Sequence, residues 1–214
     1  MHNMRKIILT LLATCLPVTA SYAGGMDTLF LEQVYPNGGS TLYCQEPFQL
    51  GDRILVTQIY DERRLAQHFG CRSSRLCRNN PQFTDIYQDR HALFPVTRLA
   101  ELDRRRTLFG DLPDTTNKNA HCGYKQSFQV FEPPVNAKGD VARAMLYLHE
   151  RYELPLLGTL EMYQRWSRED PVTDEERQRN NVIEKLQGNR NPFIDNPAQA
   201  QRLQGSSPLN MQFP

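Results

Sequence analysis

Arginines are the residues of this chain whose type and spacing point most directly to a chemical task. Residues 61–78 hold five arginines against two acids, and three more arginines follow Asp103. A guanidinium is a planar fork of N–H donors that matches the oxygens of a phosphate group. This half of the chain could therefore bind a nucleic-acid backbone without reading bases, or form a solvated surface paired with Asp85, Asp89 and Glu101. The arginines are Arg63, Arg64, Arg72, Arg75, Arg78, Arg104, Arg105 and Arg106.

The cysteines are the second group with defined chemistry. Cys15 lies in the first apolar run, and four cysteines follow it. An even number in an oxidising compartment predicts two disulfides, for which three pairings are possible. We favour Cys71 with Cys77, which closes a small loop, and Cys44 with Cys122, which joins distant segments. A zinc site is disfavoured because no CxxC pair occurs and the histidines do not flank the cysteines at ligand spacing.

The first 23 residues have the pattern of a secretory signal peptide. Arg5 and Lys6 precede an apolar run at 7–16, and small residues stand at positions 21 and 23, just before Gly24. The run is too short to span a bilayer, and no later run is long enough. We therefore expect a periplasmic or secreted protein whose mature chain starts near Gly24.

Charge and length limit the function classes. The whole chain has a formal net charge of +1, and removal of Arg5 and Lys6 with the leader brings it to −1. No global field would then attract nucleic acid, so any such binding must come from the local arginines. The remaining chain of about 190 residues predicts one domain with its own core.

Strand patterns come first along the chain and helix patterns later. Residues 53–59 read as a strand, and residues 127–131 alternate as a half-buried strand should. After Pro133 and Pro134 the apolar residues take helical spacing. The first helix is expected to bury Val141, Ala144, Met145 and Leu148. The second is expected to bury Leu160, Tyr163 and Trp166.

A third helix is predicted between a capping box and a glycine. Thr173 with Glu176 forms the box, and Gly188 permits a left-handed end. Its buried face is expected to carry Val182, Ile183 and Leu186. The side chains expected to bond backbone groups in the following turn are those of Asn189 and Asn191. Residues 198–214 contain too few apolar residues to fold, so we predict a disordered tail.

Four stretches of the second half closely resemble the bacterial endonuclease I family. They are GDVARAMLY at 139–147, Trp166 with DPV at 170–172, Arg179-Asn180 with Ile183, and QGNRNPFID at 187–195. Members of that family are secreted or periplasmic nucleases with a ββα-metal (His-Me finger) site. The resemblance implies a mixed α+β fold with a helical C-terminal half, in one domain over residues 24–197. It also implies a divalent metal such as magnesium and cleavage of DNA, often also RNA, without sequence specificity; we expect a monomer.

The catalytic pair of the family is replaced in this chain. The family has a metal-binding glutamate followed by a histidine that takes a proton from water. Alignment on the phenylalanine and glycine at 69–70 places this pair on Asp61 and Glu62, and a shift by one residue would place it on Glu62 and Arg63. Neither register supplies a histidine. Asp61 still offers a hard oxygen to magnesium. Glu62 would be a weaker base near neutrality, with an ordinary pKa of about 4.3 against about 6.5 for histidine.

A second family segment is present but altered. The asparagine that binds metal in the family corresponds to Ala92 in DRHALFP at 89–95, and an alanine methyl cannot coordinate a cation. His91, its neighbour, is either a substitute catalytic residue or a packed, hydrogen-bonded histidine. His68 could compensate for the lost histidine only if its loop turned inward. Arg75 lies where the family places its phosphate-holding arginine.

The sequence thus leads to a nuclease with an altered site. Glu62 would activate water, Asp61 would bind the metal and Arg75 would hold the phosphate. The residues expected to contact the nucleic-acid backbone are Arg63, Arg72 and Arg78. The alternative is a catalytically impaired relative that keeps the fold and binds nucleic acid or a partner in the cell envelope.

Overall fold

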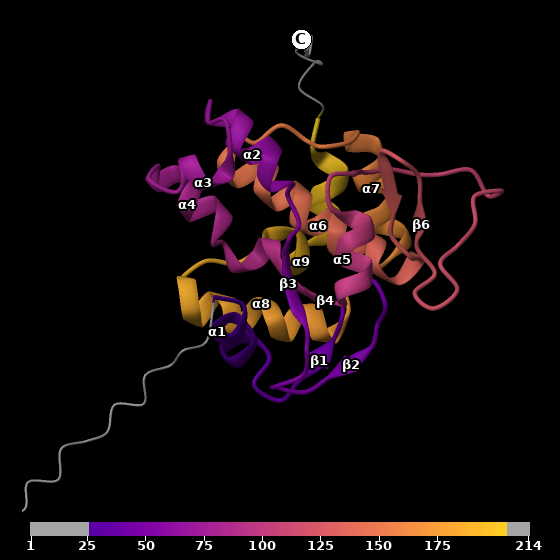
Figure 1. The fold of residues 1–214 in the computed structure, drawn as a ribbon, viewed down its shortest axis with the longest axis horizontal. Helices are drawn as coiled ribbons and strands as arrows, with labels where there is room; N and C mark the ends of the chain where they lie inside the picture. Colours follow the sequence, from indigo (N-terminus) through magenta and orange to yellow (C-terminus); the bar gives the residue numbers. More distant parts are fainter. Residues whose placement is uncertain (1–25, 205–214) are drawn as a thin grey trace, which may run out of the picture.

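A long central helix, α6 (Val135–Tyr152), carries a large part of the buried side chains. The computed structural model describes residues 26–204 of the chain. The helix begins directly after Pro134, as the sequence predicts, and packs most extensively against α7 (Leu160–Glu169). The predicted buried faces of both helices are confirmed, except that Leu160 is only partly buried. Figure 1 shows α6 in the middle of the molecule with other elements on several sides.

The remaining helices are shorter, and most lie around α6. In Figure 1, α2, α3 and α4 lie together at the upper left, whereas α1 and α8 lie at the bottom. Their bounds are α1 (Met26–Val34), α2 (Glu62–His68), α3 (Ser74–Cys77), α4 (Pro81–Tyr87), η1 (Arg90–Ala92), α5 (Arg98–Arg104), α8 (Asp174–Gln187), α9 (Pro192–Asp195) and η2 (Pro197–Arg202).

The strands in the described part of the chain form three small, separate sheets. Two are antiparallel pairs, and in the third β7 lies between a parallel and an antiparallel neighbour. The pairs are β1 (Gly39–Ser40) with β2 (Pro47–Phe48) and β3 (Leu55–Gln58) with β4 (Leu93–Val96); the third sheet is β5 (Leu108–Phe109), β7 (Val130–Glu132) and β6 (Lys125–Gln126). Short sheets beside a helical second half confirm the mixed α+β fold.

The two predicted strands have different outcomes. The strand expected at 53–59 is confirmed as β3. The strand expected at 127–131 is wrong over its first half, because Ser127 closes a turn between β6 and β7. Its backbone N–H donates to the carbonyl of Val130 at 2.8 Å, and its hydroxyl accepts from the N–H of Val130 at 3.2 Å. Phe128 therefore stands at the tip of a hairpin and is 94% exposed rather than half-buried.

The third helix, α8, begins and ends as predicted. Both hydrogen bonds of the Thr173–Glu176 capping box are present, and Gly188 has a φ of +79°. On its expected buried face, Ile183 is fully buried and Val182 half-buried, but Leu186 is 38% exposed, so that part of the prediction is wrong.

The two asparagines beyond α8 differ from each other. Asn191 bonds backbone groups as predicted: it accepts from the N–H of Phe193 and donates to the carbonyl of Arg143. The prediction is wrong for Asn189, whose side chain bonds the side chains of Gln187 and Tyr147 instead.

Both predicted disulfides are present. Cys44–Cys122 joins residues 78 positions apart, and Cys71–Cys77 closes a loop with a separation of 6. Across residues 26–204, no helix combines the length and the apolar character needed to cross a bilayer.

The predicted disorder is wrong for residues 198–204. Pro197–Arg202 forms the 3-10 helix η2, with Ala200 fully buried against α6 and α7. The side chain of Gln164 donates to the carbonyls of Ala200 and Leu203 at 2.9 and 3.0 Å, so these two bonds hold the segment although its composition is poor in apolar residues. The expected signal peptide and the rest of the expected tail lie outside the described residues.

Candidate functional site

The β3–β4 hairpin positions the two segments in which we expected catalytic residues. Its register pairs Leu55 with Val96 and Gln58 with Leu93. Just past the paired strands, the N–H of Ile59 donates to the carbonyl of Ala92 at 2.8 Å. The strand that leads to Asp61 is therefore joined directly to η1, and Figure 1 shows β3 and β4 side by side.

Side-chain bonds fix the short link between β3 and α2. The amide of Gln58 donates to the carbonyl of Ile86 at 3.1 Å, and its oxygen accepts from the N–H of Tyr60 at 3.2 Å. The buried Tyr60 donates its hydroxyl to the carbonyl of Pro155 at 2.9 Å. Because these groups are buried and paired, the start of α2 is held in one place.

Asp61 and Glu62 lie at the N-terminus of α2, and both are half-buried. Asp61 is the N-cap, and one of its carboxylate oxygens accepts from the N–H of Arg64 at 2.9 Å. Both residues lie in the first turn, at the positive end of the helix dipole. Asp61 thus has a clear structural role besides any role in chemistry.

Arg104 connects this helix start with α5. It is buried, and it donates to the hydroxyl of Thr57 at 2.8 Å and to the carbonyl of Gln58 at 3.2 Å. Burial alone would lower its pKa, but the neighbouring Tyr43, Glu101 and Asp61 raise it. Arg104 is therefore a structural cation beneath the site and not a free phosphate ligand.

The segment expected to carry the metal ligand is closed to solvent. Ala92 and His91 have no exposed surface. The Nε2 atom of His91 lies 3.1 Å from the carbonyl oxygen of Asn189, and its ring packs edge-on against Tyr147. Burial, together with the positive charge of Arg179, lowers the pKa of His91 to about 4. The structure thus places His91 in the core, where a phosphodiester cannot reach it, as the packed alternative requires.

Asp89 is the polar centre of that core, and sequence reasoning missed it. Its carboxylate accepts from the hydroxyls of Tyr147 and Tyr152, each at 2.6 Å. It also accepts from the N–H of His91 at 2.8 Å and from the amide of Gln187 at 2.9 Å. Burial and the Asp89 charge raise the pKa of Tyr147, which stays a donor. The aspartate of DRHALFP was the available signal, but its partners lie far away in sequence.

The stretches that carry the family resemblance build the support for this site. Arg179 donates to the carbonyls of Arg90 and Leu93 at 2.6 and 2.7 Å and stacks on the ring of Phe94. Its guanidinium therefore holds η1 against the start of β4. Asn180 exchanges two hydrogen bonds with the backbone of Asn191, which fixes the turn after α8.

Four expected phosphate-binding arginines lie on the surface of α2, α3 and the loops beside them. Their residues are exposed, and none of the four side chains makes a salt bridge or hydrogen bond within residues 26–204. They are Arg63, Arg72, Arg75 and Arg78. The pairing with Asp85, Asp89 and Glu101 that a merely solvated surface would show does not occur for them, because Glu101 pairs with Arg104 and Asp89 is buried.

The structure does not bring every expected residue together. The short helix α3, which carries Arg75, is held against α2 through the buried Cys77, whose sulfur lies 3.7 Å from the carbonyl oxygen of Ala66. That contact is near the end of α2, whereas Asp61 and Glu62 are at its start. Among the described residues, no hydrogen bond or salt bridge joins Arg75 to either carboxylate.

The residues at this site fit at most a loosely held metal ion. Within the described chain, a grouping of three ligand-type side chains occurs at Cys44, Glu46 and Cys122, but there the two sulfurs form a disulfide. Magnesium keeps most of its waters and is commonly bound by one or two carboxylates together with substrate phosphate. Asp61 can supply one such carboxylate, and Ala92 cannot supply the second ligand.

These features belong to a known family. The chain is a member of the Endonuclease I family, whose model matches residues 65–198. The match begins within α2, after the positions of Asp61 and Glu62, and covers η1, the Asp89 network and the C-terminal helices.

Individual relatives are named as extracellular or periplasmic nucleases. An extracellular deoxyribonuclease of Aeromonas hydrophila is 35% identical over 127 residues, which are 58% of this chain and 55% of that protein. A periplasmic deoxyribonuclease of the same organism is 35% identical over 127 residues, 58% and 54% of the two chains. An extracellular ribonuclease of Bacillus subtilis (strain 168) is 39% identical over 92 residues, 34% and 32% of the two. The chain spans about half the length of the first of these relatives.

Proposed function

We propose that this chain is a periplasmic or secreted nuclease that hydrolyses phosphodiester bonds of DNA, and also of RNA, without reading base sequence. The observation that carries the proposal is the pair Asp61–Glu62 at the rigid start of α2, on a helix that together with α3 and the loops beside them presents four arginines without ion-pair partners in the described chain. Family membership and the names of relatives, which include deoxyribonucleases and a ribonuclease, support the same conclusion. Secretion is supported by relatives named extracellular and periplasmic.

The expected site residues other than His91 have defined tasks in this proposal. Glu62, half-exposed in the first turn of α2, accepts a proton from the attacking water. Arg75 holds a phosphate oxygen, while Arg63, Arg72 and Arg78 bind the backbone on either side. Backbone contacts of this kind carry no sequence information, which is why we expect little base specificity.

A divalent metal, with magnesium the best match to oxygen ligands, would be held by Asp61 and the substrate phosphate. Nucleases of this family generally depend on a metal. When bound, the ion would neutralise charge on the phosphate and the leaving oxygen. Asp61 keeps one oxygen on the N–H of Arg64, so it orients its second oxygen while it caps the helix.

The buried Ala92 favours one competing function. Because a methyl group replaces the second metal ligand of the family, metal affinity is reduced, and the chain could bind nucleic acid without cutting it. The two functions differ in turnover, and both require the exposed arginines.

The deciding experiment compares cleavage with binding. The protein freed of residues 1–23, with both disulfides intact, is incubated with supercoiled plasmid and with RNA, in magnesium and in EDTA, beside Glu62→Ala. Cleavage that needs magnesium and is lost in Glu62→Ala supports the nuclease. Intact substrate together with salt-dependent binding would show the non-cleaving relative, and a protein that does neither would refute both.

A further inference from the structure

A single phenylalanine, Phe128, stands at the tip of the β6–β7 hairpin without covering any core. It is 94% exposed, the largest exposed fraction among the large apolar side chains of the described residues. The turn around it is closed by the Ser127–Val130 hydrogen bonds, so the ring is presented on a short, defined loop. A stiff aromatic in water is a candidate contact for a flat apolar ligand surface.

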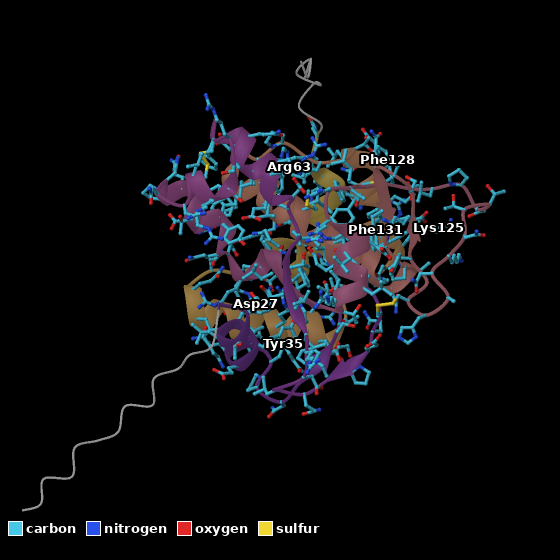
Figure 2. The ribbon with its side chains drawn as sticks, in the orientation of Figure 1. Asp27, Tyr35, Arg63, Lys125, Phe128 and Phe131 are labelled. Carbon is cyan, nitrogen blue, oxygen red and sulfur yellow. A yellow bond between two sulfur atoms is a disulfide. The ribbon has the colours of Figure 1, made fainter. Side chains whose placement is uncertain are left out.

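The base of this hairpin is firmly anchored. Phe131 is fully buried and packs against the rings of Tyr43, Tyr124 and Phe109. In Figure 2, Phe131 lies within the body of the molecule, whereas Phe128 lies at its upper margin in that view. The hairpin therefore combines a fixed root with an aromatic tip, which is the arrangement of a binding element and not of an unfolded loop.

Two arginines lie beside the hairpin. The amide of Gln126 donates to the carbonyl of Asp103 at 2.8 Å, and the N–H of Leu108 donates to the carbonyl of Gln129 at 2.8 Å. The turn that carries Phe128 therefore runs along residues 103–108, which include Arg105 and Arg106. Both guanidiniums are exposed, and neither makes a salt bridge or hydrogen bond within the described chain.

The acids around this surface already have partners. Glu101 pairs with Arg104, and the carboxylate of Asp103 accepts from the hydroxyl of Tyr124. The cation of Lys125 is likewise paired, with Asp114 and Glu132. The hydroxyl of Tyr124 does not neutralise Asp103, but the two guanidiniums of Arg105 and Arg106 outnumber this one carboxylate, which leaves an excess of positive charge beside the hairpin.

Arg106 also has an unusual backbone. Its φ is +72°, a left-handed conformation that costs a non-glycine residue free energy and is found preferentially at functional sites. A glycine at this position would relieve the strain, so the position can be varied without loss of backbone stability.

The surface is connected to the proposed active site. Arg104, the residue before Arg105, bonds Thr57 and Gln58 at the end of β3, the strand that leads to Asp61. Asp61 is near enough to Arg104 to raise its pKa. A nucleic-acid strand at Asp61 and Glu62 could therefore continue over α5 to the hairpin.

We propose that Phe128, Arg105 and Arg106 form a binding subsite for single-stranded nucleic acid. One unpaired base stacks on the ring of Phe128, and the neighbouring phosphates bind the two guanidiniums. In a duplex the base faces are covered by their neighbours, so an exposed ring of this kind selects single strands or loops. This subsite rests on the proposed function, because it would bind the part of the nucleic acid that extends beyond Asp61 and Glu62.

The test measures binding in EDTA, so that cleavage does not consume the probe. Fluorescence anisotropy is recorded with labelled oligothymidylate, oligouridylate and a DNA duplex of equal length. Phe128→Ala and Phe128→Leu are compared, because leucine keeps the apolar surface and removes the aromatic face. Both are expected to weaken single-strand binding about 5- to 100-fold, the effect of one base–aromatic stack, and to leave duplex binding unchanged. The two single strands distinguish DNA from RNA as the preferred ligand.

Arg106→Gly tests the cationic half of the subsite. The exchange relieves the positive φ, so the melting temperature should not fall. Single-strand affinity should fall, and the slope of log K against log salt should decrease by about 0.7 for the lost phosphate contact. Gln45→Gly is the matched control, since Gln45 is an exposed neutral residue whose φ is also positive, at +52°.

The proposal is overturned if Phe128→Leu binds single strands as tightly as the wild type, or if it loses the same factor on the duplex. A wild type that binds no single strand also overturns it. A protein that binds through Phe128 but cuts nothing in magnesium would refute the nuclease activity and keep this subsite. Cleavage by a protein whose binding ignores Phe128 would remove the subsite alone.

Discussion

The carboxylate of Asp61 accepts a hydrogen bond from the backbone N–H of Arg64 at 2.9 Å, so the residue proposed to bind a metal also caps α2. An N-cap orients its side chain toward the first turn of the helix. The helix start therefore fixes one oxygen of Asp61. It also fixes the backbone of Glu62, which is the first residue of α2. Structure and proposed chemistry depend on the same side chain here, and substitutions can separate the two.

Asp61→Asn should keep the cap and lose the charge. Asparagine caps helices about as well as aspartate, whereas Asp61→Ala should lower the free energy of unfolding by about 0.5–2 kcal/mol. We expect both variants to need more magnesium for plasmid cleavage, and only the alanine variant to melt earlier. Thermal unfolding and a magnesium titration of cleavage measure the two effects. Wild-type magnesium dependence in Asp61→Asn would exclude a role for this carboxylate in metal binding.

Glu62→His combined with Ala92→Asn should restore the family's histidine and asparagine. A histidine is the better base near neutrality, and an asparagine adds an oxygen ligand. We expect plasmid cleavage at pH 7.5 to rise by about 10²- to 10⁴-fold, the usual contribution of a matched general base.

The single variants and Glu62→Gln are the controls for that experiment. Ala92 is fully buried, so the melting temperature of Ala92→Asn must be measured first. A double variant that folds but cleaves no faster than the wild type would show that these positions do not limit the reaction.

The sequence predicted periodic elements well and irregular ones poorly. The capping box at Thr173 and the glycine stop at Gly188 were predictable because each is a local hydrogen-bonding pattern. The exposed tip at Phe128 was not, because an alternating strand pattern and a serine-closed turn share the same residues. The order of residues 198–204 was also missed, since it depends on Gln164, more than 30 positions away.

At the site, the local sequence located the candidate residues but did not predict which side chains surround them. Asp61 could be placed from its distance to the phenylalanine and glycine at 69–70, and its capping role follows from its place before a helix. The burial of His91 and the hydrogen bonds of Asp89 could not be predicted. Their partners, Asn189 for His91 and Tyr152 for Asp89, are distant in the sequence. Which arginines are paired likewise depends on tertiary packing.

His91 should make stability depend on pH below neutrality. Its pKa is lowered to about 4 in the folded protein, from about 6.5 in the unfolded chain. As pH falls below 6.5 the unfolded chain binds the proton first, so stability is complete above that pH and is lost progressively down to about 4. The loss attributable to this group is about 3 kcal/mol.

His91→Phe should flatten that dependence, because phenylalanine keeps the ring packing against Tyr147 and does not titrate. Urea unfolding at several pH values between 4 and 7 measures the effect. His68→Phe, an exchange of an exposed histidine, controls for the loss of a titrating ring from the unfolded chain. A wild-type slope no steeper than that of His91→Phe would contradict the assignment.

Asp89→Ala should be strongly destabilising, because Asp89 is buried. It leaves the hydroxyls of Tyr147 and Tyr152 and the amide of Gln187 without their acceptor in a buried setting. We expect a loss of about 3 kcal/mol or more in the free energy of unfolding. Asp85→Ala, at an exposed position of α4, should change it by less than about 0.5 kcal/mol. Equal effects of the two substitutions would refute the role of Asp89 as the polar centre of the core.

The two disulfides differ in when they can form during biogenesis. Cys71 and Cys77 are 6 positions apart, so they can pair as soon as that short segment has emerged into an oxidising compartment. Cys44 must wait for Cys122, 78 positions later, and Cys71 and Cys77 emerge before Cys122 does. Early closure of the small ring removes both competing thiols. The order of oxidation, local pair first, would thus protect the long-range bond from mispairing.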